Sequence, residues 1–329
     1  MKAYRFDNVD AGLQLEDIDM PQASPGEVLI AVKAAGLCHS DCHILKENNW
    51  VGKRPITLGH EVAGNIIALG DEALNVQISD RVAVALISHP IEEMQLSASI
   101  GLGFDGGFAE YVAAPITHIV PIPHGVSYEQ AAVATDSIST AYHAILAEAK
   151  VTASTTVAIV GLGGLGLNGL RIAALQGARV YGIDIDPKKC AAAKKLGAVE
   201  CFVSLASIKD VMIDVVVDFV GLSATLSEAI TSVKLGGRIV AVGLGETETN
   251  LPLFSLVTRG IELKGSSGAS LQDFHSAMAL IASGDICPIL EDIPFTHLTE
   301  GFNRLERGEV NGRLFTRPVG NDKNTSKPA

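Results

Sequence analysis

The chain has 329 residues, of which 47% are hydrophobic, so it can bury one large core or two ordinary ones, and two domains are the better expectation. Its 37 Asp and Glu residues outnumber its 25 Lys and Arg residues, which argues against a partner made of nucleic acid or anionic membrane lipid. No apolar run reaches the roughly 18 residues that a membrane span needs, and charged side chains interrupt the first ten residues, so we expect a cytoplasmic protein.

The first third of the chain alternates short apolar runs with turn residues. Strands are predicted at 27–34, 61–69 and 81–86, and turns at Pro25-Gly26 and Gly70-Asp71. This pattern is typical of an antiparallel β unit, and we expect the unit to be barrel-like.

From about residue 131 the pattern changes to alternating strands and helices. Strands are predicted at 155–160, 178–183, 211–217, 238–242 and 261–265, and helices at 165–176, 187–196 and 271–283. Because such an order forces parallel pairing through crossover helices, it predicts a doubly wound α/β sheet. We expect the end of the chain to return and complete the first domain.

A glycine-rich turn at 161–166 follows one predicted strand and opens a predicted helix, which is the context in which a G-x-G-x-x-G pattern indicates a dinucleotide site. The first glycine permits a tight turn, the second lets the backbone approach a pyrophosphate, and the third lets the helix pack against the strand. The alternative is a glycine-rich turn without a ligand. The residues predicted to bind the cofactor here are Gly161, Gly163, Gly164, Leu165 and Gly166.

Asp184 ends the next predicted strand, 18 residues after Gly166. A carboxylate at this point can bind both hydroxyls of an adenosine ribose and would repel a 2′-phosphate, so we expect NAD rather than NADP. Lys189, one turn into the following helix, is expected to add a ribose contact. The alternatives are a solvated acid or helix cap at Asp184 and a solvated lysine at Lys189.

The segment 38–43 holds two cysteines, two histidines and an aspartate, and His60 follows soon after. This density indicates a metal site, and a thiolate with an imidazole suits zinc, which in a catalytic site needs only three protein ligands. Each residue alone would more often be structural. The cysteines, an odd number in a long chain, fit thiols or metal ligands better than a disulfide framework: Cys38, Cys42, Cys190, Cys201 and Cys287.

Taken together, these motifs resemble the zinc-containing medium-chain dehydrogenase/reductase family, which includes the alcohol dehydrogenases, and the resemblance covers nearly the whole chain. It rests on the glycine-rich turn and on Gly-Leu-Cys-His-Ser-Asp at 36–41, Gly-His-Glu-Val-Ala-Gly at 59–64, Asp-Gly-Gly-Phe-Ala-Glu-Tyr at 105–111 and Gly-Gly-Arg at 236–238. The resemblance implies a GroES-like β-barrel catalytic domain over 1–137 and 268–329, a Rossmann domain over 138–267, and an active site in the cleft.

By position, the resemblance implies that Cys38 and His60 are zinc ligands and that Glu61 either ligates the metal or sits just behind it. Asp41 corresponds to the carboxylate that orients the histidine ligand. Asp136 stands where relatives carry the third ligand, and a carboxylate oxygen is acceptable to zinc. The alternative for Asp136 is the N-cap of a helix over 137–147.

The resemblance also implies that Ser40 takes the substrate proton and that His43 relays it to solvent through the ribose hydroxyls. His39 and Arg313 are expected at the cofactor pyrophosphate, each with a surface residue as the alternative. Two residues at the end of a predicted strand are expected beside the nicotinamide, and two aromatic residues are expected to wall the substrate pocket. These are Val242 and Leu244, and Trp50 and Phe104, of which Trp50 is equally compatible with a core position.

We therefore predict a zinc-containing, NAD-dependent alcohol dehydrogenase that acts on a small alcohol or on its aldehyde or ketone. The segment 86–104 lacks the cysteines that bind a structural zinc in many relatives, so one catalytic zinc per chain is expected. The protein is expected to be a homo-oligomer, a dimer or tetramer.

Two other functions stay open. The first is a zinc-free NAD(P)H-dependent quinone or enoyl reductase of the same superfamily, against which Cys38, His60 and Asp184 argue. The second is a non-catalytic NAD-binding protein, against which Ser40, His43 and the ligand set argue.

Overall fold

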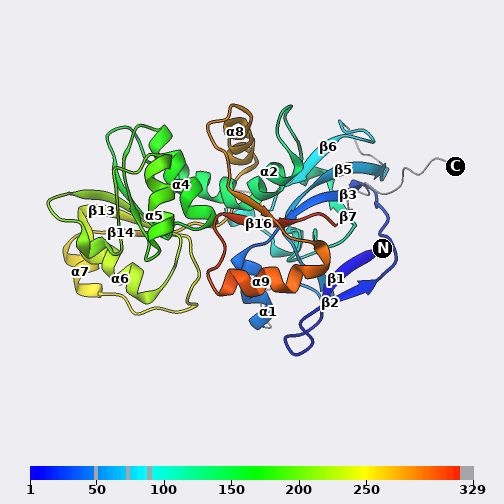
Figure 1. The fold of residues 1–329 in the computed structure, drawn as a ribbon, viewed down its shortest axis with the longest axis horizontal. Coiled ribbons are helices and arrows are strands. Elements are labelled where there is room, and N and C mark those ends of the chain that lie inside the picture. The colour runs from blue at the N-terminus through cyan, green and yellow to red at the C-terminus, as the bar shows by residue number, and fades with distance from the viewer. Residues whose placement is uncertain (48–50, 72–74, 87–90, 319–329) are drawn as a thin grey trace. The chain divides into compact units, whose positions relative to one another are not determined.

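The chain forms two units, and each contains β-sheet of its own (Figure 1). The structure, a computed structural model, describes residues 1–47, 51–71, 75–86 and 91–318. Unit 1 comprises Met1–Asp136 and Pro288–Ala329, and unit 2 comprises Ser137–Cys287. Within the described residues, no helix combines the length and the apolar character that crossing a membrane requires.

Unit 1 is built around a mainly antiparallel sheet with β3 at its centre. β3 pairs antiparallel with β5, with β7 and with β16, and the sheet continues from β5 through β6 to β8. A smaller antiparallel sheet has the order β2-β1-β4. The strands are β1 (Lys2–Phe6), β2 (Leu13–Asp17), β3 (Glu27–Gly36), β4 (Ile56–Thr57), β5 (Glu61–Leu69), β6 (Arg81–Val84), β7 (Tyr111–Pro115), β8 (Ile119–Pro121), β15 (Leu290–Asp292) and β16 (Arg313–Thr316).

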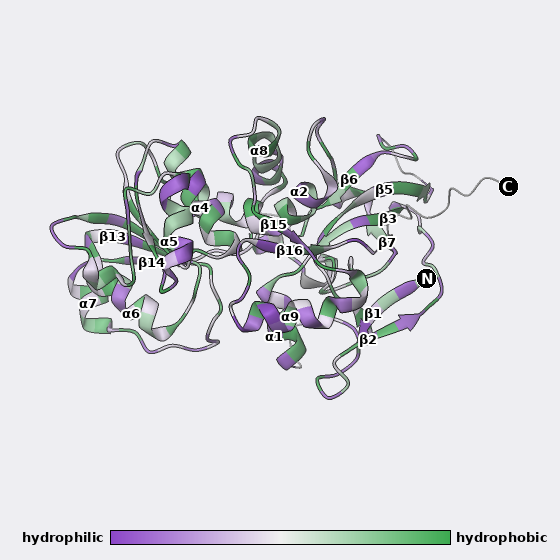
Figure 2. Ribbon diagram, in the orientation of Figure 1, coloured by the Kyte–Doolittle hydropathy of each residue, from purple (hydrophilic) through white to green (hydrophobic). Residues whose placement is uncertain are grey.

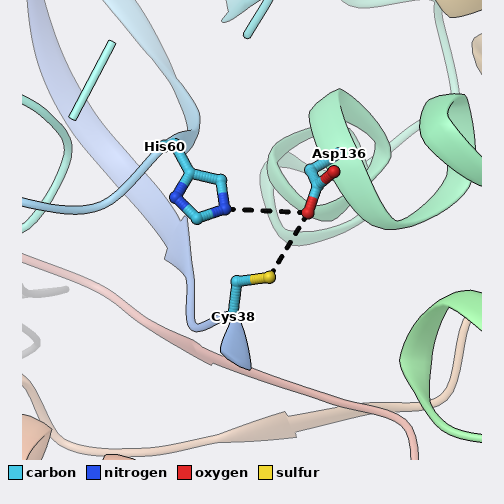
Figure 3. A group of neighbouring side chains, drawn as sticks. All are labelled: Cys38, His60 and Asp136. Atoms are coloured by element: carbon cyan, nitrogen blue, oxygen red, sulfur yellow. Dashed lines mark hydrogen bonds and ion pairs between the residues drawn. The ribbon is translucent and has the colours of Figure 1, made fainter. Parts of the chain in front are cut away.

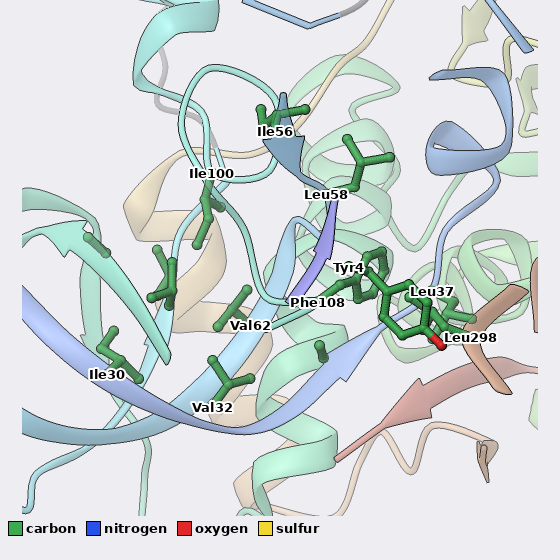
Figure 4. Close-up of a cluster of buried hydrophobic side chains, with 14 of the residues drawn as sticks. Tyr4, Ile30, Val32, Leu37, Ile56, Leu58, Val62, Ile100, Phe108 and Leu298 are labelled. Atoms are coloured by element: carbon green, nitrogen blue, oxygen red, sulfur yellow. The ribbon is translucent and has the colours of Figure 1, made fainter. Parts of the chain in front are cut away.

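The core of unit 1 explains why β3 is a near-continuous apolar run. Almost every residue of β3 is buried, because both faces of this strand are covered, as expected for a central strand. Ile30 and Val32 of β3 lie in one cluster with Val62, Phe108 and Leu298 (Figure 4). The cluster therefore joins the first strands of the chain to its last helix.

The C-terminal segment adds β15, α9 (Leu298–Glu306) and β16 to unit 1. Phe315 lies opposite Gly36 and Thr316 opposite Ala35, so β16 extends the sheet beside β3. α9 carries both hydrophobic and hydrophilic residues along its length (Figure 2), and it buries the hydrophobic ones. This return places Arg313 beside the end of β3.

Helical structure in the middle of the chain begins earlier than the sequence suggested. α2 (Tyr128–Val133) is capped by Ser127, whose Oγ accepts from Gln130 N at 3.2 Å while Gln130 Oε1 accepts from Ser127 N at 3.0 Å, a reciprocal capping box. A π-helical turn, Ala134–Ile138, follows. Asp136 lies inside this turn, so the alternative that it caps a helix starting at residue 137 is wrong.

Unit 2 is a parallel sheet with the order β11-β10-β9-β12-β13-β14. In chain order this is 3-2-1-4-5-6, the doubly wound arrangement of dinucleotide-binding folds. The strands are β9 (Thr156–Val160), β10 (Arg179–Ile183), β11 (Glu200–Phe202), β12 (Ile213–Asp218), β13 (Val233–Ala241) and β14 (Glu262–Gly265). The helices are α3 (Ser139–His143), α4 (Gly164–Leu175), α5 (Pro187–Leu196), α6 (Ser223–Ser232), α7 (Leu253–Thr258) and α8 (Leu271–Ala282).

The second boundary between the units differs from the expected one. We placed 268–329 with the first domain, but 268–287 belongs to unit 2. The reason is α8, which packs against α3, where Asp273 Oδ2 lies 2.8 Å from His143 Nδ1. The chain therefore leaves unit 2 only after this helix.

A disulfide joins Cys190 of α5 to Cys201 of β11, which corrects the expectation that these cysteines are free thiols or metal ligands. Their Cα atoms are 5.4 Å apart, within the normal range for a disulfide, because α5 returns to the sheet directly before β11. The other three cysteines are not in disulfides in the structure: Cys38, Cys42 and Cys287.

Candidate functional site

Cys38 lies where β3 ends and α1 (His39–Lys46) begins. It is the residue that precedes the helix, and its backbone N–H donates to Asp41 Oδ2 at 3.1 Å. Because Asp41 is fully buried, this hydrogen bond fixes the first turn of α1 from the inside. The turn leaves the Cys38 thiol buried, with Ser40 Oγ 3.6 Å from its sulfur.

His60 directly precedes β5, and its ring is buried between two carboxylates. Nδ1 lies 3.3 Å from Asp41 Oδ1, and Nε2 lies 3.6 Å from Asp136 Oδ2. Burial opposes the charged ring, but the charges of Asp41 and Asp136 outweigh it and raise the pKa of His60. A carboxylate behind one ring nitrogen is the usual arrangement of a metal-binding histidine, although Nδ1 and Asp41 Oδ1 do not meet in hydrogen-bond geometry here.

Cys38, His60 and Asp136 point toward one another from the end of β3, the start of β5 and the π-helical turn (Figure 3). Asp136 Oδ2 is 3.4 Å from Cys38 Sγ, and the three potential ligand atoms all lie within 4.8 Å of one another. Sulfur, imidazole nitrogen and carboxylate oxygen form a donor set that zinc accepts, and three protein ligands leave a position for water or substrate. The residues therefore fit a catalytic zinc.

Glu61 follows His60 directly, but its carboxylate is hydrogen-bonded to Arg313. Arg313 Nε donates to Glu61 Oε2 at 3.0 Å, and Nη2 donates to Oε1 at 2.7 Å and to Asp136 Oδ2 at 3.1 Å. Burial raises the pKa of Glu61, and the Arg313 guanidinium opposes that rise. Arg313 is only 4% exposed. The structure therefore places Arg313 against two carboxylates, and its expected contact with the cofactor phosphates stays a prediction.

Two glycines shape this site, although the sequence did not single them out. A Cβ on Gly36 would lie 1.8 Å from Glu61 Oε2, so the carboxylate occupies the space of the missing side chain. Gly59 precedes His60 with φ +95°, a backbone conformation that favours glycine. Gly36 opens the family motif at 36–41 and Gly59 opens the motif at 59–64, and these positions are the one sequence feature that could have pointed to them.

The residues expected to move a proton lie on α1. Ser40 is beside the Cys38 sulfur, and His43 is half-buried on the same helix. His39 is exposed, and its Nε2 lies 3.1 Å from the Leu305 carbonyl oxygen of α9. The expected phosphate contact of His39 and the relay through Ser40 and His43 stay predictions.

The glycine-rich turn in unit 2 joins β9 to α4. Gly161 has φ +84°, and a Cβ on Gly166 would lie 1.7 Å from the Gly161 carbonyl oxygen, so both positions require glycine. Gly163 precedes the helix, and a Cβ there would meet nothing within 4 Å. Gly164 and Leu165 begin the helix, whose first N–H groups are available to an anion.

Asp184 lies at the end of β10, directly beside this turn. Its Oδ2 accepts from Leu162 N at 2.8 Å, and its Oδ1 accepts from Asp186 N at 2.9 Å. Lys189 Nζ lies 3.8 Å from Asp184 Oδ2. A carboxylate so close to the glycine-rich turn is typical of a site that binds the ribose of NAD and repels a 2′-phosphate.

The structure describes three of the four residues that we expected at the nicotinamide or in the substrate pocket. Val242 follows β13 and is half-buried, and Leu244 is 50% exposed. In unit 1, Phe104 packs edge-on against His118, with 6.4 Å between the ring centroids. Trp50 lies outside the described residues.

Comparison with known proteins identifies both units. Residues 24–124 match the alcohol dehydrogenase GroES-like domain, and residues 164–283 match the zinc-binding dehydrogenase domain. An NAD-dependent alcohol dehydrogenase of Sulfurisphaera tokodaii is 32% identical, over 97% of this chain and 100% of the relative. An alcohol dehydrogenase of Geobacillus stearothermophilus is 30% identical, over 95% of this chain and 98% of the relative.

Solved structures agree with these matches. Acetophenone reductase from Geotrichum candidum, solved in complex with NAD, is 30% identical, with a TM-score of 0.88 over 96% of both chains. The GroES-like and Rossmann architecture expected from the sequence is therefore confirmed. The chain belongs to the zinc-containing medium-chain alcohol dehydrogenase family and is an oxidoreductase that transfers a hydride between an alcohol, or its aldehyde or ketone, and NAD.

Proposed function

We propose that the reaction is carried out at a single zinc held by Cys38, His60 and Asp136. The observation that carries this proposal is the convergence of their sulfur, nitrogen and oxygen atoms within 4.8 Å. Two further facts support it. Asp41 lies behind His60 at 3.3 Å, where it can orient the ring, and residues 86–104 contain no cysteine for a second, structural zinc.

Zinc bound there would act as a Lewis acid that makes an alcohol hydroxyl more acidic, and NAD would accept the hydride. Ser40 would receive the substrate proton, because its hydroxyl lies 3.6 Å from the Cys38 sulfur. His43, on the same helix, would pass the proton on to solvent. Asp184 and the glycine-rich turn would hold the adenosine half of the cofactor.

We further propose a small alcohol as the substrate, with secondary alcohols included. The similar Geotrichum candidum enzyme is named for a ketone, acetophenone, and a ketone is the oxidised form of a secondary alcohol. The chain is also proposed to assemble with copies of itself, through a surface on unit 2 that is argued below.

The test is the variant Cys38→Ser, with Cys42→Ser as the matched control. Both cysteines are buried and lie on or beside α1, but only Cys38 belongs to the proposed ligand set. Zinc content, NAD affinity and NADH formation over a panel of primary and secondary alcohols are measured in each preparation. Cys38→Ser should lose zinc and about a thousandfold or more in turnover, since Lewis-acid stabilisation is worth several kcal/mol.

NAD affinity should stay unchanged in Cys38→Ser, and Cys42→Ser should keep its zinc, turnover and NAD affinity. A wild-type protein that contains no zinc but reduces enones with NADPH would instead be a zinc-free reductase. A protein that binds NAD and zinc but turns over no alcohol, aldehyde or ketone on the panel would be a binding protein.

A further inference from the structure

The Cys190–Cys201 disulfide lies beside Asp184, the residue proposed to bind the adenosine ribose. Cys201 pairs with Gly182 in the sheet, and a Cβ on Gly182 would lie 3.4 Å from the Cys201 sulfur. The carbonyl oxygen of the next residue, Phe202, accepts from Asp184 N at 3.0 Å. On the other side, Cys190 Sγ lies 3.7 Å from the Asp184 carbonyl oxygen. The disulfide therefore joins the two segments that flank the end of β10.

Lys189 connects the disulfide to the carboxylate of Asp184. It directly precedes Cys190 in α5, its side chain is 22% exposed, and its Nζ lies 3.8 Å from Asp184 Oδ2. The sequence predicts a ribose contact for Lys189 as well. Any movement of the first turn of α5 would therefore move this ammonium group relative to the carboxylate and to the ribose that both residues are proposed to bind.

Few buried side chains hold α5 to the rest of unit 2. Of its ten residues only Ala193 is buried, whereas α4, which has twelve residues, buries seven. A segment with few buried apolar contacts opens locally at a low cost in free energy. The covalent link from Cys190 to β11 is therefore a main restraint on the first turn of α5, and breaking this link should let the turn move.

Both cysteines of the disulfide are half-buried, so a reductant can reach the bond between them. A dithiol reduces it by thiol–disulfide exchange: a thiolate of the reductant attacks one sulfur, the Cys190–Cys201 bond breaks, and the second sulfur of the reductant closes the reductant's own disulfide. Two electrons and two protons pass from the dithiol to the two cysteines, which become thiols. In the cytoplasm, where we expect this chain, disulfides are usually transient and redox-sensing.

We propose that the Cys190–Cys201 disulfide is a redox switch of NAD binding. The oxidised form fixes Lys189 beside Asp184 and binds NAD tightly, and the reduced form leaves the first turn of α5 free to move and binds NAD more weakly. The inference rests on the proposed role of Asp184 at the ribose. The proposed zinc ligands belong to unit 1, so the switch acts on the cofactor and not on the metal.

The test compares the oxidised wild-type protein with the protein reduced by dithiothreitol and then desalted under nitrogen. Dissociation constants of NAD and of ADP-ribose, which lacks the nicotinamide, are measured by calorimetry, and far-UV circular dichroism checks the fold. The double variant Cys190→Ser with Cys201→Ser lacks the switch. Cys287→Ser is the matched control, because this exposed cysteine also belongs to unit 2 but is not in the disulfide.

Reduction should raise both dissociation constants of the wild type by about 3- to 10-fold, the effect of a binding-competent conformation that is populated roughly a third to a tenth of the time. The KM for NAD should rise with them, and kcat should not fall, because reduction leaves the proposed zinc ligands untouched. The double variant should bind NAD as the reduced wild type does, with or without dithiothreitol. Cys287→Ser should respond to the reductant as the wild type does.

Equal dissociation constants in the oxidised and reduced wild type would overturn the inference. A reduced protein that unfolds, or a protein purified in air with all five cysteines as thiols, would also overturn it, because no local switch then exists. Asp184→Ala separates these failures from failure of the proposed function. If Asp184→Ala binds NAD as tightly as the oxidised wild type, Asp184 does not hold the ribose, whereas weaker binding keeps that role even where the switch fails.

Discussion

His143, in α3, is a buried histidine that bridges two carboxylates within unit 2. Its Nδ1 lies 2.8 Å from Asp273 Oδ2 of α8, and its Nε2 lies 3.2 Å from Glu148 Oε1. The other oxygen of Glu148, Oε2, pairs with Lys264 of β14. Burial opposes the charged ring, but Asp273 and Glu148 outweigh it and raise the pKa of His143. The protonated ring therefore ties two helical segments together.

The raised pKa predicts how this contribution depends on pH. A histidine with a raised folded-state pKa stabilises fully below its unfolded pKa of about 6.5, and the stabilisation is lost as pH rises through the folded value. His143→Gln should therefore cost about 2 kcal/mol of unfolding free energy at pH 6 and clearly less at pH 9, measured by urea unfolding. His275→Gln, an exposed histidine of α8, is the control and should show no such difference. If His143→Gln lowers the free energy of unfolding equally at both pH values, the stabilisation comes from the neutral ring and not from its protonation.

At the level of single residues, the three proposed zinc ligands could be named from the sequence because cysteine, histidine and aspartate are residue types that bind metals. Cys38, His60 and Asp136 stand in recognisable motifs, and the structure brings them together. The partner of Arg313 was not predictable, because Glu61 lies 252 positions away in the chain and only the folded sheet joins them. The role of Gly36 likewise depends on a close approach that no local pattern encodes.

At the level of elements, the sequence predicted best where local signals were strong. The glycine-rich turn and the apolar runs around it marked β9, α4 and β10 to within a residue or two. The start of α2 was missed, although Ser127 and Gln130 form a capping box that a closer reading could have found. The π-helical turn around Asp136 has no such signal. β13 begins earlier than predicted, because glycine is unfavourable inside strands and the glycines at 236 and 237 therefore suggested a turn before residue 238.

The Cys190–Cys201 disulfide connects α5 to β11 across a sequence separation of 11 residues. Closing a loop of this length lowers the entropy of the unfolded chain and is worth up to about 3 kcal/mol. Reduction with dithiothreitol should therefore lower the free energy of unfolding of the wild-type protein by up to about 3 kcal/mol, measured by chemical denaturation. In the double variant Cys190→Ser with Cys201→Ser, the reductant should leave the free energy of unfolding unchanged.

Thiol counting checks the same prediction independently. Alkylation of the unfolded, unreduced protein should modify Cys38, Cys42 and Cys287 only. Mass spectrometry that finds all five cysteines alkylated would show that the disulfide is not formed. Cys287→Ser is the control for unfolding, because this exposed cysteine is not in the disulfide and its loss should leave the effect of the reductant unchanged.

At the level of the whole molecule, we propose that a second copy of the chain docks at the edge of the unit 2 sheet. β14 ends the sheet, and within the described residues its one strand neighbour is β13, so its other side offers backbone groups for pairing. α7, directly before β14, exposes three large apolar side chains: Leu253 at 65%, Phe254 at 80% and Val257 at 68%. A two-fold axis beside β14 would place β14 of one copy next to β14 of the other, and the apolar side chains of α7 would then be covered by the second copy.

We therefore expect Phe254→Glu to shift the protein toward the monomer, because it places a charge in the apolar surface that a second copy would bury. Multi-angle light scattering should give the mass of at least two chains for the wild type and a lower mass for Phe254→Glu. Val199→Glu is the control, since it is also an exposed apolar residue of unit 2 but lies beside β11, at the opposite edge of the sheet. Its mass should equal that of the wild type. If Phe254→Glu keeps the wild-type mass, the copies do not meet at α7, and a wild type with the mass of one chain would exclude the assembly altogether.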